Sequence, residues 1–245
     1  MQPTDREPLH VVHSRAAPGF ADAQRAPIES LMLSLGKLGV RVVAVVTPSA
    51  VQDVKPLSRA LCAGFAAADI KTALIDLDPE GASEDSEPGW NPGLKLTAVH
   101  TQRDAAGYDL VVSRPTAQTR PLFNNLLHFR RALAEDLGAY KCVIINLTPI
   151  FEPIDTAPNP IAVARAADAV IVVCGTGRTD ASDAAKAVTE LTTAGCKVIG
   201  TILDNSDAVY VGQQMAEAVE KLSFVPPRVK DGLCAILRSS KLLNS

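Results

Sequence analysis

The stretch from Val42 to Asp78, VVAVVTPSAVQDVKPLSRALCAGFAAADIKTALIDLD, decides the fold of this chain. It opens with the apolar run Val42–Val46, passes through a polar loop, and continues as an amphipathic stretch over Leu57–Ala68. A second apolar run, Thr72–Ile75, follows directly. Short apolar runs are typical of buried strands, and apolar residues at helical spacing are typical of helices. The stretch therefore predicts a strand, a loop, a helix and a second strand.

The same alternation continues to both sides of this unit. Apolar runs predict further strands, and amphipathic spacing predicts further helices. The additional strands are expected at Leu94–Val99, Leu110–Ser113, Cys142–Asn146, Ala169–Cys174 and Lys197–Leu203. The additional helices are expected at Asp22–Leu38, Pro121–Leu137, Ile161–Ala166, Ala181–Ala194 and Ala208–Leu222.

Two of these strands are apolar on both faces, at Val143–Ile145 and at Val170–Val173. Such strands are typical of a parallel sheet that is covered by helices on both sides. The sequence therefore predicts a doubly wound α/β fold, with a mostly parallel sheet flanked by helices in a single P-loop NTPase-like domain. We expect this domain at 21–245, preceded by a flexible arm at 1–20.

Composition excludes several classes of function. Of the 245 residues, 47% are hydrophobic, 21% are charged and only 4% are aromatic, and the net charge is −3. This balance is typical of a globular protein with a large core, and it gives no general attraction to nucleic acid. The five cysteines are scattered, and with the four histidines they show no metal-ligand spacing. We therefore expect no metal site and no nucleic-acid partner.

No apolar run reaches the roughly 18 to 20 residues that span a bilayer, and the first residues show no signal-peptide core. We expect a cytoplasmic protein that reaches the inner membrane only through a partner. Two features leave alternatives open. Trp90, in the acidic loop Pro79–Gly93, is either buried or a partner contact. The amphipathic tail Pro226–Ser245 is either a packed helix or an anchor.

The loop after Val46 lies where a nucleotide-binding protein holds a phosphate. A phosphate-binding loop follows the pattern G-x-x-x-x-G-K-[ST], in which glycines let the backbone close around the anion. If Lys55 is the motif lysine, Ser49, Val54 and Pro56 occupy the two glycine positions and the hydroxyl position. Pro56 has no backbone N–H, and it disfavours a helical conformation at Lys55, so we expect the lysine to be displaced. Pro56 nevertheless suits the start of a helix.

Further along, the ordered run from Val143 to Val173 resembles the bacterial tyrosine kinase family. The family shows a strand ending in Asp-x-x-Pro, a Ser-Asp-Ala turn and the segment LARxADGVLLVV. The matching segments here are Val143–Pro149, Ile154–Asp155 and Ala164–Val173, continued by Gly175–Thr179 and Gly200–Leu203. The resemblance covers about Asp22 to Tyr210. It implies a P-loop protein that works with a membrane co-polymerase controlling polysaccharide chain length.

Active members of the family use three nucleotide elements, and each is altered in this chain. The glycine loop is changed as described. The second element, Asp-x-Asp-x-Arg, keeps Asp76 and Asp78 but has Glu80 at the arginine position. The third is a strand-end aspartate, which Asn146 replaces. An amide offers no negative charge to magnesium. The resemblance therefore implies a nucleotide site at Lys55, Asp76, Asp78 and Asn146 that is only vestigial, with no catalytic residue assigned.

Two further family features are reduced. The tyrosine-rich tail that the family autophosphorylates has no counterpart in Pro226–Ser245, which contains no tyrosine. A motif that serves ring assembly in the family is only partly matched, by Asp22 and Arg25, so self-association stays an open expectation.

Our leading hypothesis from the sequence is a catalytically inactive kinase-like protein of exopolysaccharide biosynthesis or export. It would regulate chain length or assembly by binding a membrane co-polymerase. The alternative is an active ATP-dependent protein tyrosine kinase or ATPase with an atypical loop, which would use Lys55, Asp76 and Asp78 with ATP and magnesium. A weaker alternative is a partition-type positioning ATPase.

Overall fold

The computed structural model describes residues 12–13, 25–50, 53–78, 89–97, 100–152 and 154–204. The chain divides into two compact units, residues 1–206 and 207–245, and all described residues belong to the first. The helix predicted at Ala208–Leu222 and the tail Pro226–Ser245 lie outside the described residues.

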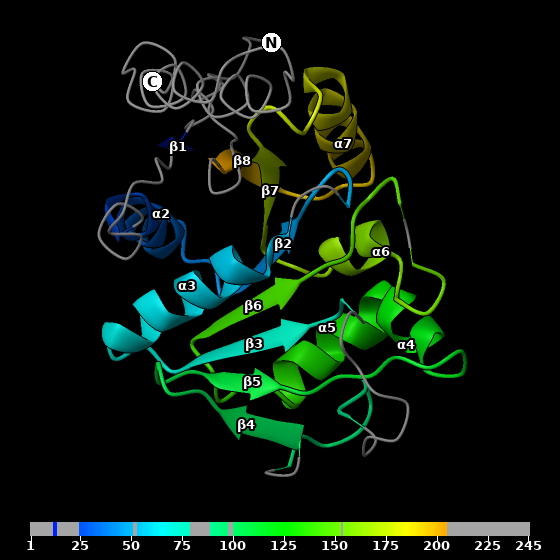
Figure 1. Ribbon diagram of the computed structural model, residues 1–245. Coiled ribbons are helices and arrows are strands. Elements are labelled where there is room, and N and C mark those ends of the chain that lie inside the picture. The colour runs from blue at the N-terminus through cyan, green and yellow to red at the C-terminus, as the bar shows by residue number, and fades with distance from the viewer. Residues whose placement is uncertain are drawn as a thin grey trace, which may run out of the picture. The chain divides into compact units, whose positions relative to one another are not determined.

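The described residues form an eight-stranded sheet in the order β1-β8-β7-β2-β6-β3-β5-β4 (Figure 1). All neighbouring strands are parallel except β4 and β5, which are antiparallel. This confirms the predicted doubly wound, mostly parallel sheet flanked by helices. The strands are β1 Val12–His13, β2 Val42–Val46, β3 Thr72–Asp76, β4 Thr101–Arg103, β5 Asp109–Val111, β6 Cys142–Asn146, β7 Ala169–Gly175 and β8 Val198–Asp204.

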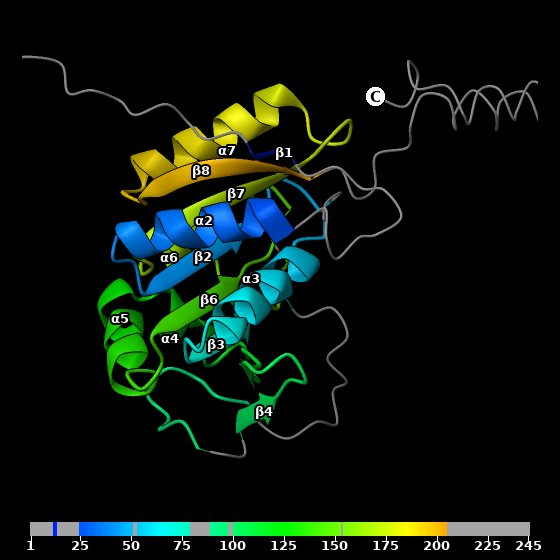
Figure 2. The same ribbon diagram turned by 90° about the vertical axis from the view of Figure 1, so that its left-hand side faces the viewer.

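Helices cover both faces of the sheet, as its apolar strands require. Figure 2 shows α2 and α3 together in front of one face. Strand residues pointing to that face, such as Val43, Leu74 and Ile144, pack with Leu61 and Phe65 of α3. The other face is packed by α4, α5, α6 and α7. The helices are α2 Arg25–Lys37, α3 Lys55–Ala67, α4 Arg120–Asn124, α5 Leu126–Glu135, α6 Pro160–Ala164 and α7 Ala181–Thr193.

The single helix predicted at Pro121–Leu137 is wrong, because the segment forms two helices. Asn125 interrupts it with extended backbone, φ −82° and ψ 107°. Its side-chain oxygen accepts a hydrogen bond from the His128 N–H and so caps α5. An asparagine that satisfies the free amides of a helix start favours a new helix over continuation of the old one.

The strand predicted at Leu94–Val99 is also wrong over the described residues 94–97. Gly93 turns the chain with a φ of +92°, and Leu94 is left half exposed. The edge strand is instead β4, Thr101–Arg103, which is polar and therefore carries no apolar signal. At the other edge, Val12–His13 of the predicted arm pairs with β8, and the rest of that arm lies outside the described residues.

Trp90 is fully buried, as one of the two sequence readings predicted. Its ring packs edge-on against Phe123, with 6.2 Å between the ring centroids, and its indole N–H donates to Asp136 Oδ2 at 3.2 Å. The last part of the acidic loop is therefore anchored at Trp90 to α4 and to the end of α5.

Among the helices of the described part of the chain, none is long and apolar enough to cross a bilayer.

Candidate functional site

The candidate site lies at the carboxyl ends of the neighbouring strands β2, β6 and β3. These strands run parallel, so their ends meet at one edge of the sheet (Figure 1). The chain passes from β2 to β3 in one direction and from β6 to β7 in the other, so the strand order reverses here. Doubly wound sheets bind their ligands in the crevice at such a point.

The four site residues predicted from the sequence come together at this edge. Lys55 Nζ lies 3.3 Å from Asp78 Oδ2. Asn146 Nδ2 donates to Asp76 Oδ1 at 2.8 Å, and the backbone N–H of Asp78 donates to the same oxygen at 3.1 Å. The lysine, the two aspartates and the asparagine thus form one continuous series of polar contacts.

Asn146 is the buried centre of this series. Only 1% of its surface is exposed, and its Oδ1 lies 3.3 Å from the Ser58 hydroxyl of α3. Ser58 is fully buried and also lies 3.0 Å from the Val54 carbonyl oxygen. Both the nitrogen and the oxygen of the Asn146 amide therefore have partners, as is usual for polar groups that are buried in a folded protein. The site connects β6 to α3 as well as to β3.

The loop between β2 and α3 has its backbone amides engaged by carboxylates of the same chain. The Ala50 N–H donates to Glu152 Oε2 at 2.8 Å, and the Lys55 N–H donates to Asp53 Oδ1 at 2.9 Å. Hydrogen bonds from an amide to an ionised carboxylate are among the stronger ones in proteins. Two amides of this loop are therefore bound internally, at the position where the sequence pattern would hold a phosphate.

The start of α3 differs from the expectation drawn from Pro56. The helix begins at Lys55 itself, with Val54 as its N-terminal cap residue. The prediction that Pro56 disfavours a helical conformation at Lys55 is therefore wrong, while the prediction that Pro56 starts the helix well is confirmed. The first helical turn tolerates proline because the missing N–H has no partner inside the helix. The ammonium of Lys55 consequently points back to the strand ends.

Negative charge dominates this network. Asp53, Asp76, Asp78 and Glu152 contribute four carboxylates, and Lys55 contributes one ammonium. Within the described ranges, no three His, Cys, Asp or Glu side chains are grouped so that they could hold a metal ion.

Three participants in the site were not found from the sequence. Asp53, two residues before the helix start, carries a local signal, because aspartate at such positions often binds the amides of a helix start. Ser58 lies inside the helix without any motif. Glu152 is 102 residues from Ala50, and no local pattern connects them.

Solved structures with a similar fold include two kinase domains. The kinase domain of Escherichia coli tyrosine kinase ETK has a TM-score of 0.62 and 19% identity, over 75% of this chain and 74% of that chain. The kinase domain of VpsO has a TM-score of 0.60 and 21% identity, over 76% of this chain and 98% of that chain.

The fold is also found in an enzyme of another kind. Cobyrinic acid a,c-diamide synthase from Mycobacterium smegmatis has a TM-score of 0.50 and 15% identity, over 81% of this chain and 92% of that chain. No protein-family model and no curated protein matches the sequence. The chain therefore has the fold of bacterial tyrosine kinase domains, and its chemistry has to be argued from its own residues.

Proposed function

We propose that this chain is a catalytically inactive tyrosine-kinase-like protein that acts by binding a partner. The observation that carries the proposal is the engagement of two loop amides by Glu152 and Asp53, at 2.8 and 2.9 Å. A triphosphate needs those amides as donors and would place its own negative charge beside both carboxylates. The residues present do not fit a triphosphate.

The other residues at the nucleotide-like site are also less suited to bind a triphosphate and magnesium. Lys55 is paired with Asp78, Pro56 has no N–H to offer, and Asn146 donates its amide to Asp76. A neutral amide cannot replace a carboxylate toward magnesium or its water shell. Phosphoryl transfer depends on positioning and charge stabilisation, and losing a single preorganised donor typically costs about a hundredfold to a thousandfold in rate. Several altered elements together leave little scope for catalysis.

The biological setting is inferred from the sequence resemblance. The ordered segments between Val143 and Val173 resemble bacterial tyrosine kinases. The similarity in fold to the ETK and VpsO kinase domains supports this relationship. We infer a role in exopolysaccharide biosynthesis or export. The protein would be cytoplasmic and would regulate chain length or assembly as an adaptor for a membrane co-polymerase.

One observation favours the alternative of an active ATP-dependent tyrosine kinase. Lys55, Asp76 and Asp78 lie together at the strand ends, where such an enzyme would use them with ATP and magnesium. In that case ATP would have to displace Asp53 and Glu152 from the loop amides.

Calorimetric titration with ATP and magnesium separates the two functions. The adaptor predicts no saturable binding and no autophosphorylation, whereas micromolar binding together with autophosphorylation would overturn it.

Lys55→Ala provides the cellular comparison, with Arg131→Gln as a matched surface control that breaks only the exposed pair with Glu135. The adaptor predicts that polysaccharide production is unchanged in both variants, and the kinase predicts its loss in Lys55→Ala alone. Capture from bacterial membranes tests the partner, which must include a co-polymerase.

A further inference from the structure

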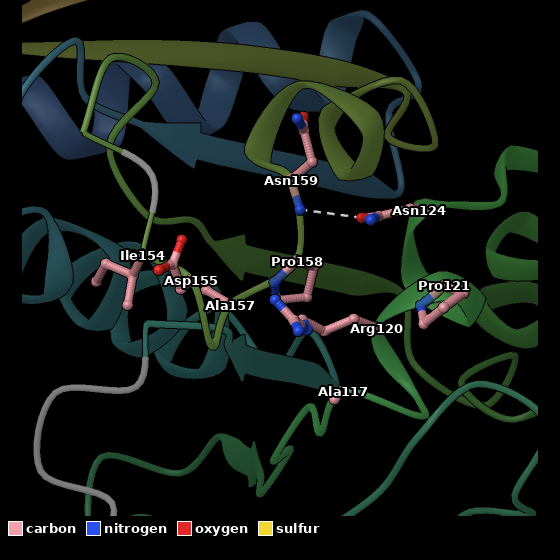
Figure 3. Close-up of a pocket in the computed structure, with 9 residues that line it drawn as sticks. All are labelled: Ala117, Arg120, Pro121, Asn124, Ile154, Asp155, Ala157, Pro158 and Asn159. Carbon is pink, nitrogen blue, oxygen red and sulfur yellow. Dashed lines mark hydrogen bonds between the residues drawn. The ribbon is translucent and has the colours of Figure 1, made fainter.

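A polar cavity lies outside the network of Lys55, Asp76, Asp78 and Asn146 and shares no side chain with it. It has a volume of about 340 Å³ and lies between α4 and the loop that leads into α6 (Figure 3). Its lining residues are Ala117, Arg120, Pro121, Asn124, Ile154, Asp155, Ala157, Pro158 and Asn159.

The walls of this cavity are held together by hydrogen bonds. Asn124 Oδ1 of α4 accepts from the backbone N–H of Asn159 at 2.9 Å, the bond drawn in Figure 3. Asn159 Oδ1 in turn accepts from the Ala162 N–H at 3.0 Å and caps α6. The Ala157 N–H donates to the Ile154 carbonyl at 2.9 Å, which closes a turn in the opposite wall. The cavity is therefore preformed, as binding sites usually are.

Arg120 brings a positive charge into the cavity without a direct hydrogen-bonding partner for its guanidinium among the described residues. Its side chain is partly buried, and it makes no hydrogen bond or ion pair with any residue in the described part of the chain. In Figure 3 it extends from α4 toward Pro158. A guanidinium that has lost part of its hydration without gaining an acceptor favours binding of an anion.

Asp155 restricts which anion fits. Its carboxylate lines the same cavity without forming an ion pair with Arg120, and Figure 3 shows it on the other side of Ala157. A dianion such as phosphate would be repelled by Asp155, whereas a single carboxylate beside Arg120 would be repelled less. Asp155 can also accept an N–H from the ligand. Pro121, Pro158 and Ile154 provide apolar walls for the ligand's carbon chain.

We propose that this cavity binds an acidic side chain presented by an extended segment of a protein partner. The carboxylate pairs with Arg120, a backbone N–H of the segment donates to Asp155, and neighbouring apolar atoms pack on the two prolines. The proposal does not depend on whether the nucleotide-like site is active.

The test uses the full chain and two capped tripeptides, acetyl-Leu-Glu-Leu-amide and acetyl-Leu-Gln-Leu-amide. NMR titration follows the side-chain Nε–H signal of Arg120 and the backbone amide of Asn159. The glutamate peptide is expected to shift both signals saturably, and the glutamine peptide to bind about tenfold more weakly or worse, because a charge-assisted bidentate pair is lost. Arg120→Gln should abolish the difference between the peptides. Arg131→Gln on α5 is the control, since its side chain is exposed and outside the cavity.

Two further arms separate the ligand classes. Inorganic phosphate should bind more weakly than the glutamate peptide, and Asp155→Asn should raise phosphate affinity several-fold because a repelling charge is removed. Succinate that binds as tightly as the peptide would overturn the assignment to a protein partner. Phosphate that binds as tightly would overturn the selection of a carboxylate. No saturable shift of Arg120, or binding that survives Arg120→Gln, would overturn the site itself.

Discussion

At the scale of single residues, Asn146 places an uncharged amide at the buried centre of the candidate site. Its Nδ2 lies 2.8 Å from Asp76 Oδ1, and the residue is 1% exposed. At such a distance and burial an amide nitrogen stabilises the Asp76 carboxylate, whereas a carboxylate oxygen would repel it. The asparagine therefore suits the acidic edge in which it lies, independently of any ligand.

Asn146→Asp is expected to destabilise the protein by about 1–3 kcal/mol at neutral pH. The amide N–H that donates to Asp76 would be replaced by a carboxylate oxygen, so two buried acceptors would face each other. Repulsion raises the pKa of one of the two carboxyl groups in the folded state above its unfolded value of about 4. The destabilisation is therefore full above that raised pKa and disappears as the pH falls toward 4. Thermal unfolding of both proteins between about pH 4 and 8 measures the difference. Adding Asp76→Asn restores a donor and should recover stability; a pH-independent loss in Asn146→Asp would contradict the repulsion.

Trp90 reports on Asp136, whose carboxylate accepts the indole N–H. Burial raises the pKa of Asp136, more than the hydrogen bond from Trp90 lowers it. Because the chain has one tryptophan, its emission is expected to titrate with a midpoint above the ordinary aspartate value of about 3.9. Ionised Asp136 opposes folding at neutral pH, and this effect weakens as the pH falls through the raised pKa. Asp136→Asn should remove the transition; a midpoint at or below 3.9 would contradict it.

At the scale of elements, α2 and α3 pack closely because Gly64 has no side chain. A Cβ at this position would lie 2.7 Å from Met32 Sδ and 3.3 Å from Ile28 Cγ2. Close helix contact lets Leu35 of α2 and Phe65 of α3 pack in one buried cluster with strand residues such as Val43. The small residue at position 64 therefore serves packing, since glycine inside a helix otherwise costs stability.

Gly64→Val is expected to lower the free energy of unfolding by about 1–3 kcal/mol, because its extra atoms overpack the contact with α2. Met32→Ala in the same chain should recover part of the loss by making space. Gly36→Ala is the matched control, because a Cβ there meets nothing within 4 Å, and it should stabilise by about 0.5–1 kcal/mol through helix propensity. Chemical denaturation measures all four proteins. An unchanged stability in Gly64→Val would show that α2 is not held at this contact.

At the scale of the whole molecule, the central sheet is buried between two helix layers, and the described residues include four cysteines in the sheet or in the segments that pack on it. Cys62, Cys142, Cys174 and Cys196 are all buried. Burial raises the pKa of each thiol, to about 12 for Cys142 and about 11 for Cys174. The reactive thiolate is therefore almost absent from the folded protein at neutral pH.

These four thiols are expected to resist alkylation at pH 8 and to react together when the domain unfolds. Iodoacetamide labelling resolved by mass spectrometry, with and without denaturant, measures each site. Equal rates that follow global unfolding would agree with one cooperative core. Fast labelling of one cysteine alone would instead reveal a local opening in the layer that contains it.

The sequence by itself determined the sheet and most of its helices. β2 and β6 follow the predicted bounds, because fully buried strands are uninterrupted apolar runs whose signal is local. The prediction from the sequence missed β4, because its polar residues carry no such signal. It also missed the break before α5, where Asn125 caps a new helix.

The positions of Lys55, Asp76, Asp78 and Asn146 at one edge followed from the sequence, because parallel strands end on the same side. The internal engagement of the loop amides was decided by tertiary structure alone. Glu152 reaches Ala50 only because the loops after β2 and β6 lie side by side. Arg120 and Asp155 line one cavity only because α4 packs beside the loop before α6. Contacts between residues distant in the chain leave no periodic trace in the sequence, since packing fixes them after the elements have formed.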